Sequence, residues 1–442
     1  MTSVRVARWG LPVLLLLFPG SSFAQQPLSV AQAVARARAH NPTVRAAEAG
    51  ARQAGRRVAE ARAGWLPRVD YAEGWQRGDQ PVFVFSSLLM QRQFTAANFA
   101  LDALNNPAAI NNYHSGVSVE QQVFDGGRLR SAIRAAELSR EIAGLATTET
   151  SSGIALQTTQ AYGAALVAAA NTRAAAAAVK AAEEDLQHAE HRRDVGVAPE
   201  ADVLALQVHL AQMRERQIAS TSEEAIARAR LNQLMGDPLE TRYALDEPAP
   251  AAAALPSLDA LEQDALAHRP EVKQADAQVQ LAEAARGAAR AGWLPDVAVQ
   301  GLYDLNGGQF DSRASSWTVG AQLRWNVFNG GADLARTRAA ADGIARAEAA
   351  RDQVTSAVRL DVLSARQALE SARAREAVGQ AAVAQARESQ RMIRDRYEAG
   401  LATVTDLLRA ATAVLDAESQ RTAATVDILT SQAALDHALG RQ

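Results

Sequence analysis

The side chains that could perform chemistry in this sequence are few, and two neighbouring histidines are the first to consider. His188 and His191 lie one helical turn apart with Glu190 between them. This spacing differs from the pattern that places two histidines and a glutamate around a zinc ion, and no third ligand is evident. A solvated, charged helix face is the favoured interpretation of this segment.

Other catalytic patterns are missing from the sequence. It contains neither a glycine-rich phosphate loop nor a nucleophile elbow, and Leu234–Pro238 simply ends a helix. The near balance of 46 basic and 49 acidic residues gives no indication of a nucleic-acid partner. We therefore predict that the protein is not an enzyme and uses no metal and no cofactor.

The N-terminus predicts export from the cytoplasm. Arg5 and Arg8 precede an apolar run over residues 11–18, and Ser22–Ala24 provides a cleavage site, so residues 1–24 are expected to be a signal peptide. No later segment approaches the ~20 apolar residues of a membrane-spanning helix. With no cysteine there is neither a disulfide nor a lipid-bearing anchor. Any membrane attachment must then come from strands.

The sequence repeats itself, and the repeat defines the elements that must position any functional residue. Ala39–Val44 matches Ala267–Val272, and Ala63–Pro67 matches Ala291–Pro295 at the same spacing. Farther along the chain, Val123–Gly127 matches Val327–Gly331 at a shorter spacing. The first copy therefore contains an insertion that the second copy lacks.

In each copy, the residue pattern predicts the same order of elements: helices, a strand pair, a very long helix, a glycine turn and a returning helix. We assign the first repeat to residues 25–245, a linker to residues 246–256 and the second repeat to residues 257–442. In the first repeat, strands are expected at about 67–76 and 116–124, a long helix over 128–195 and a return helix over 199–235. In the second, strands are expected at about 296–304 and 316–328, a long helix over 332–397 and a return helix over 403–440.

The last strand shows the period of two most clearly. Trp317, Val319 and Leu323 alternate with polar residues such as Thr318 and Gln322. Strands of this length can cross a bilayer, but four strands with two open edges cannot remain unpaired in lipid. Three chains would supply twelve strands and leave a lumen, whereas two chains would give a filled barrel.

The absence of proline from residues 108–198 and 296–442 permits exceptionally long helices. A continuous helix over residues 128–195 would reach roughly 100 Å at ~1.5 Å per residue. Val354, Val358 and Val362 mark an apolar stripe in the second copy, and Ala174–Ala178 offers small side chains for close helix packing. These helices are predicted to form coiled-coil walls.

Over nearly the whole mature chain, these features resemble the TolC-like outer-membrane efflux protein family. The duplicated order of elements, with Val-Phe-(Asp/Asn)-Gly-Gly after each strand pair, is similar to that family's plan. The resemblance implies a mainly α fold: a long α-helical coiled-coil barrel continuous with a trimeric twelve-strand membrane β-barrel, four strands per chain. It also implies an outer-membrane location, contact with outer-membrane lipid, and a role in tripartite multidrug efflux or type I secretion. The implied partners are a periplasmic membrane-fusion adaptor and an inner-membrane transporter of the RND or ABC type.

The resemblance places two glycine turns at the periplasmic tip, where adaptor helices would meet channel helices end to end. The expected contact residues are Val195, Gly196, Val197 and Ala198 in the first turn, and Ala399, Gly400, Leu401, Ala402 and Thr403 in the second. A glycine C-cap followed by a new helix start explains the same residues structurally. The two interpretations are compatible.

Asp406 occupies the position of an acidic pore-constricting ring in the family, and three copies would surround one axis. Thr403–Asp406 is equally a capping-box pattern, so a gate and a helix cap both remain open. Arg409 stands where relatives often carry a second aspartate, which changes the charge of the implied pore gate.

The resemblance also implies a link between the two copies near the tip. Tyr397 and Asp202 match the tyrosine and aspartate of this latch, and loss of the phenol in a Tyr397→Phe variant should raise single-channel conductance. The family's companion arginine-to-threonine link has no match, because Ala402 and Ala201 occupy those places. A more easily opened tip is expected.

The insertion lies between the first two strands and is expected to be an extended loop at the outer mouth. Its apolar segments, Val82–Phe85 and Leu88–Met90, could line or plug the entrance, but packing against neighbouring subunits is favoured. Asn105, Asn106, Asn111 and Asn112 predict an irregular loop tip. The main alternative for the whole chain is a periplasmic coiled-coil structural or adaptor protein without a pore.

Overall fold

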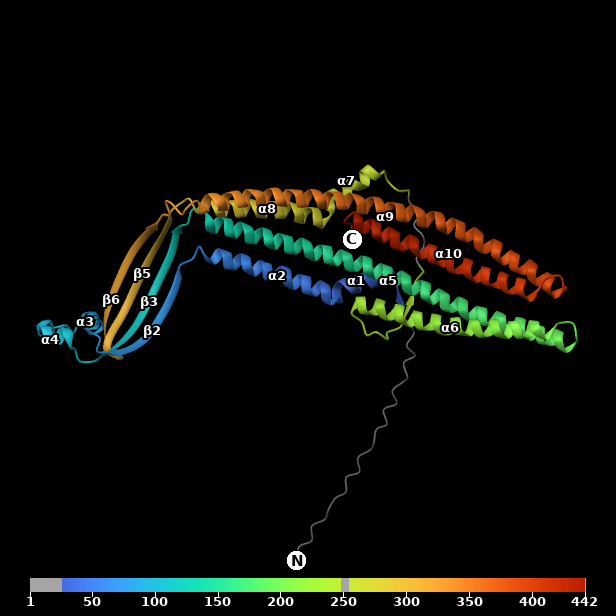
Figure 1. Ribbon diagram of the computed structural model, residues 1–442, viewed down its shortest axis with the longest axis horizontal. Helices are drawn as coiled ribbons and strands as arrows, with labels where there is room; N and C mark the ends of the chain where they lie inside the picture. The colour runs from blue at the N-terminus through green and yellow to red at the C-terminus, as the bar shows by residue number, and fades with distance from the viewer. Residues whose placement is uncertain (1–25, 248–253, 442) are drawn as a thin grey trace, which may run out of the picture.

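A computed structural model describes residues 26–247 and 254–441. The molecule is elongated, with a four-stranded sheet at one end and long helices running away from it (Figure 1). The predicted signal peptide and part of the predicted linker lie outside the described residues. Within the described ranges, no helix combines the length and hydropathy that crossing a membrane requires.

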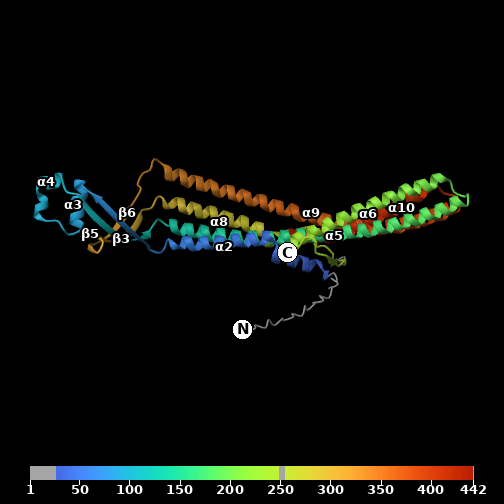
Figure 2. The ribbon, with the colours of Figure 1, turned by 90° about the horizontal axis from the view of Figure 1, so that it is seen from below.

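Two helices dominate the fold, α5 (Arg128–Asp194) and α9 (Ala332–Glu398), each of 67 residues. At ~1.5 Å per residue each spans roughly 100 Å. Each reverses through a short turn into a second helix, α6 (Glu200–Met235) or α10 (Val404–Ala438). The result is two antiparallel hairpins, which Figure 2 shows lying together at their far ends.

Shorter helices accompany the halves of α5 and α9 nearest the sheet. They are α1 (Val30–His40), α2 (Pro42–Ala63), α7 (Leu258–His268) and α8 (Pro270–Ala291). α2 and α8 both begin with proline at the first helical position and end just before a Gly-Trp-Leu-Pro turn. The two halves of the chain therefore repeat the same sequence of elements.

The sheet is an antiparallel meander in the order β2-β3-β5-β6. Its strands are β2 (Arg68–Gly78), β3 (Ile110–Phe124), β5 (Asp296–Gln309) and β6 (Ser312–Arg324). Within the described residues, the outer edges of β2 and β6 have no partner strand. The chain therefore presents two open edges, as the sequence predicted.

Two expectations about the first repeat are wrong. β3 begins at Ile110 rather than near residue 116, so Asn111 and Asn112 pair with β2 and do not form an irregular tip. The insertion is also not an extended loop, because α3 (Pro81–Met90), a 3₁₀ turn (Ala96–Phe99) and α4 (Leu101–Asn105) fold within it. Proline at the first position of α3 and the apolar run that follows it favour this helix.

A second, two-stranded sheet was not predicted. β1 (Gln26–Leu28) pairs in parallel with β4 (Tyr243–Leu245). The buried Tyr162 hydroxyl lies 2.6 Å from the Leu28 carbonyl oxygen and 2.9 Å from that of Asp246. Burial raises the pKa of Tyr162 to about 12. α5 is thus tied to the segment that enters the linker.

Candidate functional site

The two hairpin turns have the same backbone geometry. Gly196 and Gly400 adopt φ values of 79° and 75°, which L-residues with a side chain rarely adopt. The amide of Val197 bonds to the Arg192 carbonyl at 2.9 Å, and that of Leu401 bonds to the Arg396 carbonyl at 2.8 Å. These six-to-one bonds define a Schellman ending, which explains the glycine in each predicted tip.

Both turns expose apolar side chains at the far end of the molecule. Val195, Val197 and Leu401 are 73%, 63% and 69% exposed. Single exposed apolar residues are ordinary, but here each of the two turns carries at least one, and the two hairpins end side by side (Figure 1). The tip thus offers a small apolar surface flanked by the starts of α6 and α10.

Asp406 forms a capping box in this chain. Its carboxylate accepts hydrogen bonds from the Thr403 amide at 3.1 Å and from the Thr403 hydroxyl at 2.6 Å, while Thr403 caps the Asp406 amide in return. The hydrogen bonds from Thr403, assisted by the positive charge of Arg409, hold the pKa of Asp406 below its usual value. The carboxylate therefore stays ionised at neutral pH.

The predicted latch residues do meet, but the contact between them is long. The Tyr397 hydroxyl lies 3.5 Å from the Asp202 carboxylate, and both side chains are partly buried. Burial, followed by the charge of Asp202, raises the pKa of Tyr397. A hydroxyl-to-carboxylate distance of 3.5 Å marks a weak hydrogen bond.

Arg192, which the sequence analysis did not identify, makes a shorter contact between the two hairpins than the Tyr397 hydroxyl does. Arg192 on α5 donates to the Tyr397 carbonyl at 3.0 Å, and its guanidinium lies 5.2 Å from the centroid of the Tyr397 ring. The first contact is a charge-assisted hydrogen bond and the second has cation–π geometry. Arg192 therefore joins the first hairpin to the end of α9.

A second missed arginine lies nearly one helical turn before Tyr397. Arg394 on α9 approaches Asp185 on α5 to 3.3 Å, and the Asp185 side chain is only 16% exposed. Burial raises the pKa of Asp185, although the Arg394 charge opposes this. The one sequence signal was an acidic residue set within the alanine-rich stripe of α5, between Ala182 and Ala189, both of which are buried.

Apolar packing completes the junction between the hairpins. Ala189, Val203 and Leu206 form a buried cluster that Val404 and Leu408 of α10 contact. Next to this cluster, on the side away from the turns, a cavity of about 170 Å³ lies among all four long helices. Asp185 and His209 line it. Burial lowers the pKa of His209, against the pull of the Asp185 charge.

The histidine pair first considered for chemistry lies on the solvent side of this junction, where the charge of His188 favours the ionised Asp185 carboxylate. His188 and His191 are both exposed on α5. Among residues 26–247 and 254–441, no group of three His, Asp or Glu side chains is placed to hold a metal. The solvated-face interpretation agrees with these positions.

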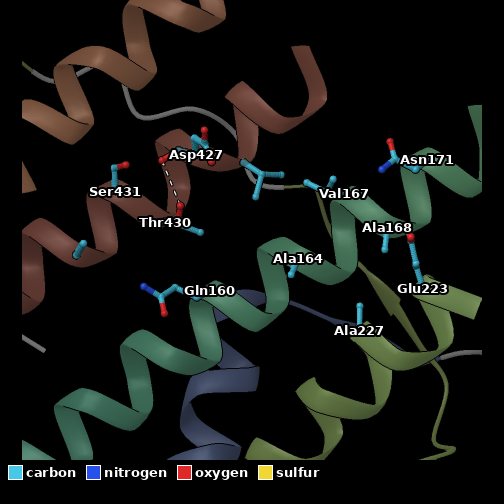
Figure 3. Close-up of a pocket in the computed structure, with 12 residues that line it drawn as sticks. Gln160, Ala164, Val167, Ala168, Asn171, Glu223, Ala227, Asp427, Thr430 and Ser431 are labelled. Carbon is cyan, nitrogen blue, oxygen red and sulfur yellow. Dashed lines mark hydrogen bonds between the residues drawn. The ribbon is translucent and has the colours of Figure 1, made fainter. Parts of the chain in front are cut away.

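A larger groove lies nearer the middle of the hairpins, between α5, α6 and α10 (Figure 3). Its volume is about 580 Å³. α5 lines it with Gln160, Ala164 and Ala168, and the Thr430 hydroxyl on α10 donates to the Asp427 carbonyl at 3.3 Å. The small α5 side chains let α10 pack closely against α5 beside this groove. We therefore assign the residues that line it a role in helix packing.

Gly163 on α5 determines how closely α10 can pack against α5. A prediction about protein stability follows from this contact. A Cβ at Gly163 would lie 2.6 Å from a methyl group of Val426, a stiff β-branched residue. Gly163→Ala should therefore destabilise the folded protein by about 1–3 kcal/mol through overpacking. Gly144→Ala is the matched control on the same helix, since a Cβ there meets nothing within 4 Å. It should stabilise by about 0.5–1 kcal/mol. Thermal unfolding midpoints of the two variants would check this; a Gly163→Ala midpoint at or above that of Gly144→Ala would contradict it.

Comparison with known proteins agrees with this architecture. A family model described as "Outer membrane efflux protein" matches residues 33–237 and 261–441. A search of curated proteins found no match.

Solved outer-membrane channels share the fold of the chain. CusC superposes with a TM-score of 0.80 at 15% identity, covering 99% of each chain. The Campylobacter jejuni channel CmeC gives 0.78 at 17% identity over 93% of this chain and 85% of that one. VceC of Vibrio cholerae gives 0.77 at 18% identity over 93% and 96%. With both repeats covered by the family model and the same fold in these channels, the chain belongs to the outer membrane efflux protein family.

Proposed function

We propose that this outer-membrane efflux channel is held narrow at its periplasmic tip by contacts between the two hairpins of each chain. The observation that carries the proposal is the pair of arginines, Arg192 and Arg394, that cross from one hairpin to the other. They act with the weaker Tyr397–Asp202 contact. Family membership favours a channel over the alternative of a periplasmic structural protein without a pore.

The family's channels are trimers, and the open edges of β2 and β6 support the same state here. An unpaired strand edge in hydrocarbon leaves amides and carbonyls without partners. Pairing β6 of one copy with β2 of the next would close twelve strands around a lumen. The sheet, not the helices, would then contact outer-membrane lipid.

Three copies would also bring three Asp406 side chains to one axis. The low pKa of Asp406 supports a ring that stays charged and favours cations. Because its carboxylate is already bonded to Thr403, the same residue would serve as helix cap and pore gate. Arg409, exposed on the next turn of α10, would reduce the net charge of the ring.

Acidification should loosen the tip. His209 has a depressed pKa in this packing, so the linked arrangement prefers the neutral imidazole. As the pH falls below 6.5, the ordinary value, an opened tip takes up the proton more readily and the linked state loses stability. Asp185 acts in the opposite direction, because its raised pKa means that protonation of its carboxyl favours the linked state. We expect His209 to dominate between pH 7 and about 5.5, because its ordinary pKa of 6.5 lies in this range, whereas that of Asp185 is 3.8.

The expected result is a rise in open probability in planar bilayers as the pH falls from 7 to about 5.5. His209→Gln should flatten this response. His40→Gln, which replaces an exposed histidine on α1, is the control and should keep it. An unchanged pH response in His209→Gln would remove His209 from the gate.

We further propose that the exposed tip receives a periplasmic membrane-fusion adaptor, which connects the channel to an inner-membrane transporter of the RND or ABC type. The supporting observation is that both turns expose apolar side chains, Val195 and Val197 on one and Leu401 on the other. The contact surface would consist of Val195, Gly196, Val197 and Ala198 of one turn and Ala399, Gly400, Leu401, Ala402 and Thr403 of the other.

Site-directed cross-linking in cells tests this docking mode. The chain has no cysteine, so a Leu401→Cys variant carries a single attachment point for a thiol-linked photocrosslinker. It should capture the adaptor, whereas Val378→Cys, 70% exposed on the side of α9 and away from the turn, should not. Capture from Val378 alone would show that adaptors lie along the side of the helices and would overturn end-to-end docking.

A further inference from the structure

We propose that the insertion in the first repeat, residues 79–109, is a lid that folds over the lumen side of the barrel mouth and limits the size of solutes that pass. This inference rests on the channel function, and Gln91 is the residue that holds the lid in place. Figure 1 places α3 and α4 beside the end of the strands that is remote from the long helices.

The two faces of the sheet differ in polarity. Directly opposed residues share a face, and one face carries Tyr71, Val117, Tyr303 and Trp317, followed toward the mouth by Glu73, which bonds to Ser115 and Arg313. The other face carries polar residues, among them Asn112, Asn306 and Thr318. In a membrane barrel the apolar face contacts lipid, so the face with Asn112 and Asn306 lines the lumen.

The insertion is attached to this polar face. At the C-terminal end of α3, the Gln91 amide donates to the Asn112 side chain at 3.0 Å and to the Asn111 carbonyl at 2.8 Å. Asn112 in turn donates to the Asn306 side chain at 3.0 Å. Gln91, Asn112 and Asn306 are only 6%, 7% and 2% exposed. Such a buried chain of amides fixes one orientation of α3, because a displaced α3 would leave its members unpaired.

The next residue, Arg92, attaches the end of α3 to a second strand, β6, on the far side of β5. Arg92 donates to the Ser315 carbonyl on β6 at 2.9 Å. In the described residues it is also the one non-glycine residue with a positive φ, 58°. A left-handed arginine is tolerated where the surroundings determine it. Gln91 and Arg92 therefore hold the end of α3 between β3 and β6, over the polar face.

The rest of the insertion is packed rather than loose. Phe94 stacks edge-on against Phe85 at 4.8 Å and against Phe99 at 5.1 Å. Val84 and Ser87 are buried. A folded unit held on the lumen face keeps its volume in the opening, whereas a mobile loop moves in and out of it.

The test measures access to the lumen from outside the cell and does not depend on the periplasmic tip. A Thr318→Cys variant places a thiol on the polar face of β6, and the chain has no other cysteine. In intact cells a small charged maleimide should label it, while a polymer-linked maleimide should react slowly. Gln91→Ala in this background should speed the polymer reaction about tenfold or more, since it removes the hydrogen bonds from α3 to the Asn112 side-chain oxygen and the Asn111 carbonyl.

Two further variants make the result specific. Arg92→Gly keeps the left-handed turn and removes the Ser315 contact, so it should also speed the polymer reaction. Gln93→Ala, exposed and two residues away, should not. Trimer formation is checked in each variant by gel mobility before labelling.

The outcomes separate the lid from the channel. If the polymer reacts equally fast with and without Gln91 and Arg92, the lid is refuted and the channel stands. If the small maleimide labels Val319→Cys on the apolar face but not Thr318→Cys, the assignment of the lumen is wrong, and the proposed channel geometry fails with it.

Discussion

Replacing Arg394 with alanine is expected to raise the open probability of the channel in planar bilayers about tenfold or more. The substitution leaves the Asp185 carboxylate, 16% exposed, without its cationic partner in the linked state. Loss of a charge-assisted bond to a buried group costs about 1–3 kcal/mol, and 1.4 kcal/mol is a factor of ten in an equilibrium. Any opening that separates α9 from α5 exposes Asp185 to water. The free-energy cost of the unpaired carboxylate therefore destabilises only the narrow state, in which Asp185 is buried.

Two comparisons make this result specific to the gate. Arg391→Ala removes an arginine from the same helix whose partners, Glu388 and Asp395, lie on α9 itself, and should leave gating unchanged. Asp185→Asn should open the channel less than Arg394→Ala, because it also removes the buried charge. Equal open probabilities for Arg394→Ala and Arg391→Ala would exclude the Arg394 contact from the closed state.

The same reasoning changes the expectation for Tyr397. The sequence suggested that Tyr397→Phe would release the latch. With a hydroxyl contact of 3.5 Å, and with Arg192 bonded to the backbone carbonyl, phenylalanine would keep most of the link. We expect a smaller rise in conductance from Tyr397→Phe than from Arg394→Ala. The missing companion link at Ala402 and Ala201 is offset by Arg192 and Arg394, so an easily opened tip is no longer expected.

The second large effect concerns the face of the sheet that meets lipid. Val319→Arg should prevent assembly in the outer membrane, whereas Thr318→Arg, its neighbour on the opposite face, should be tolerated. Arginine near the bilayer midplane costs about 2–4 kcal/mol in each chain, and all copies of a trimer carry the substitution. The polar face presents the charge to water instead.

Fractionation of membranes and the yield of heat-sensitive trimer would measure this difference. Thr318→Arg should remain a trimer with altered ion selectivity, because it places three charges in the lumen. The proposed barrel would be contradicted if Val319→Arg assembled normally while Thr318→Arg did not.

Sequence patterns that extend over many residues predicted most of the architecture. The repeat, the period of two in the strands and the two long proline-free stretches predicted four strands and two long helices, and the family match confirms this fold class and the outer-membrane location. Glycine with Schellman bonding marked both tips. All of these features can be recognised from the order of residues along the chain, without knowing which surfaces of the folded protein meet.

What the sequence did not predict depends on which surfaces meet. Arg394 resembles any arginine of a solvated helix, and only the relative rotation of α9 and α5 brings it to Asp185. The pairing of β1 with β4 joins segments far apart in the chain, each of three residues, too short for a periodic pattern. The helix in the insertion was missed because a short apolar run fits a loop, a strand or a helix equally well.

Closure of the open sheet edges by other copies is the claim on which the channel depends. The most direct test is the mass of the protein complex extracted from membranes, measured with the detergent contribution subtracted. We predict three copies per complex and a requirement for detergent throughout purification. A monomer that stays soluble in detergent-free buffer would contradict the account.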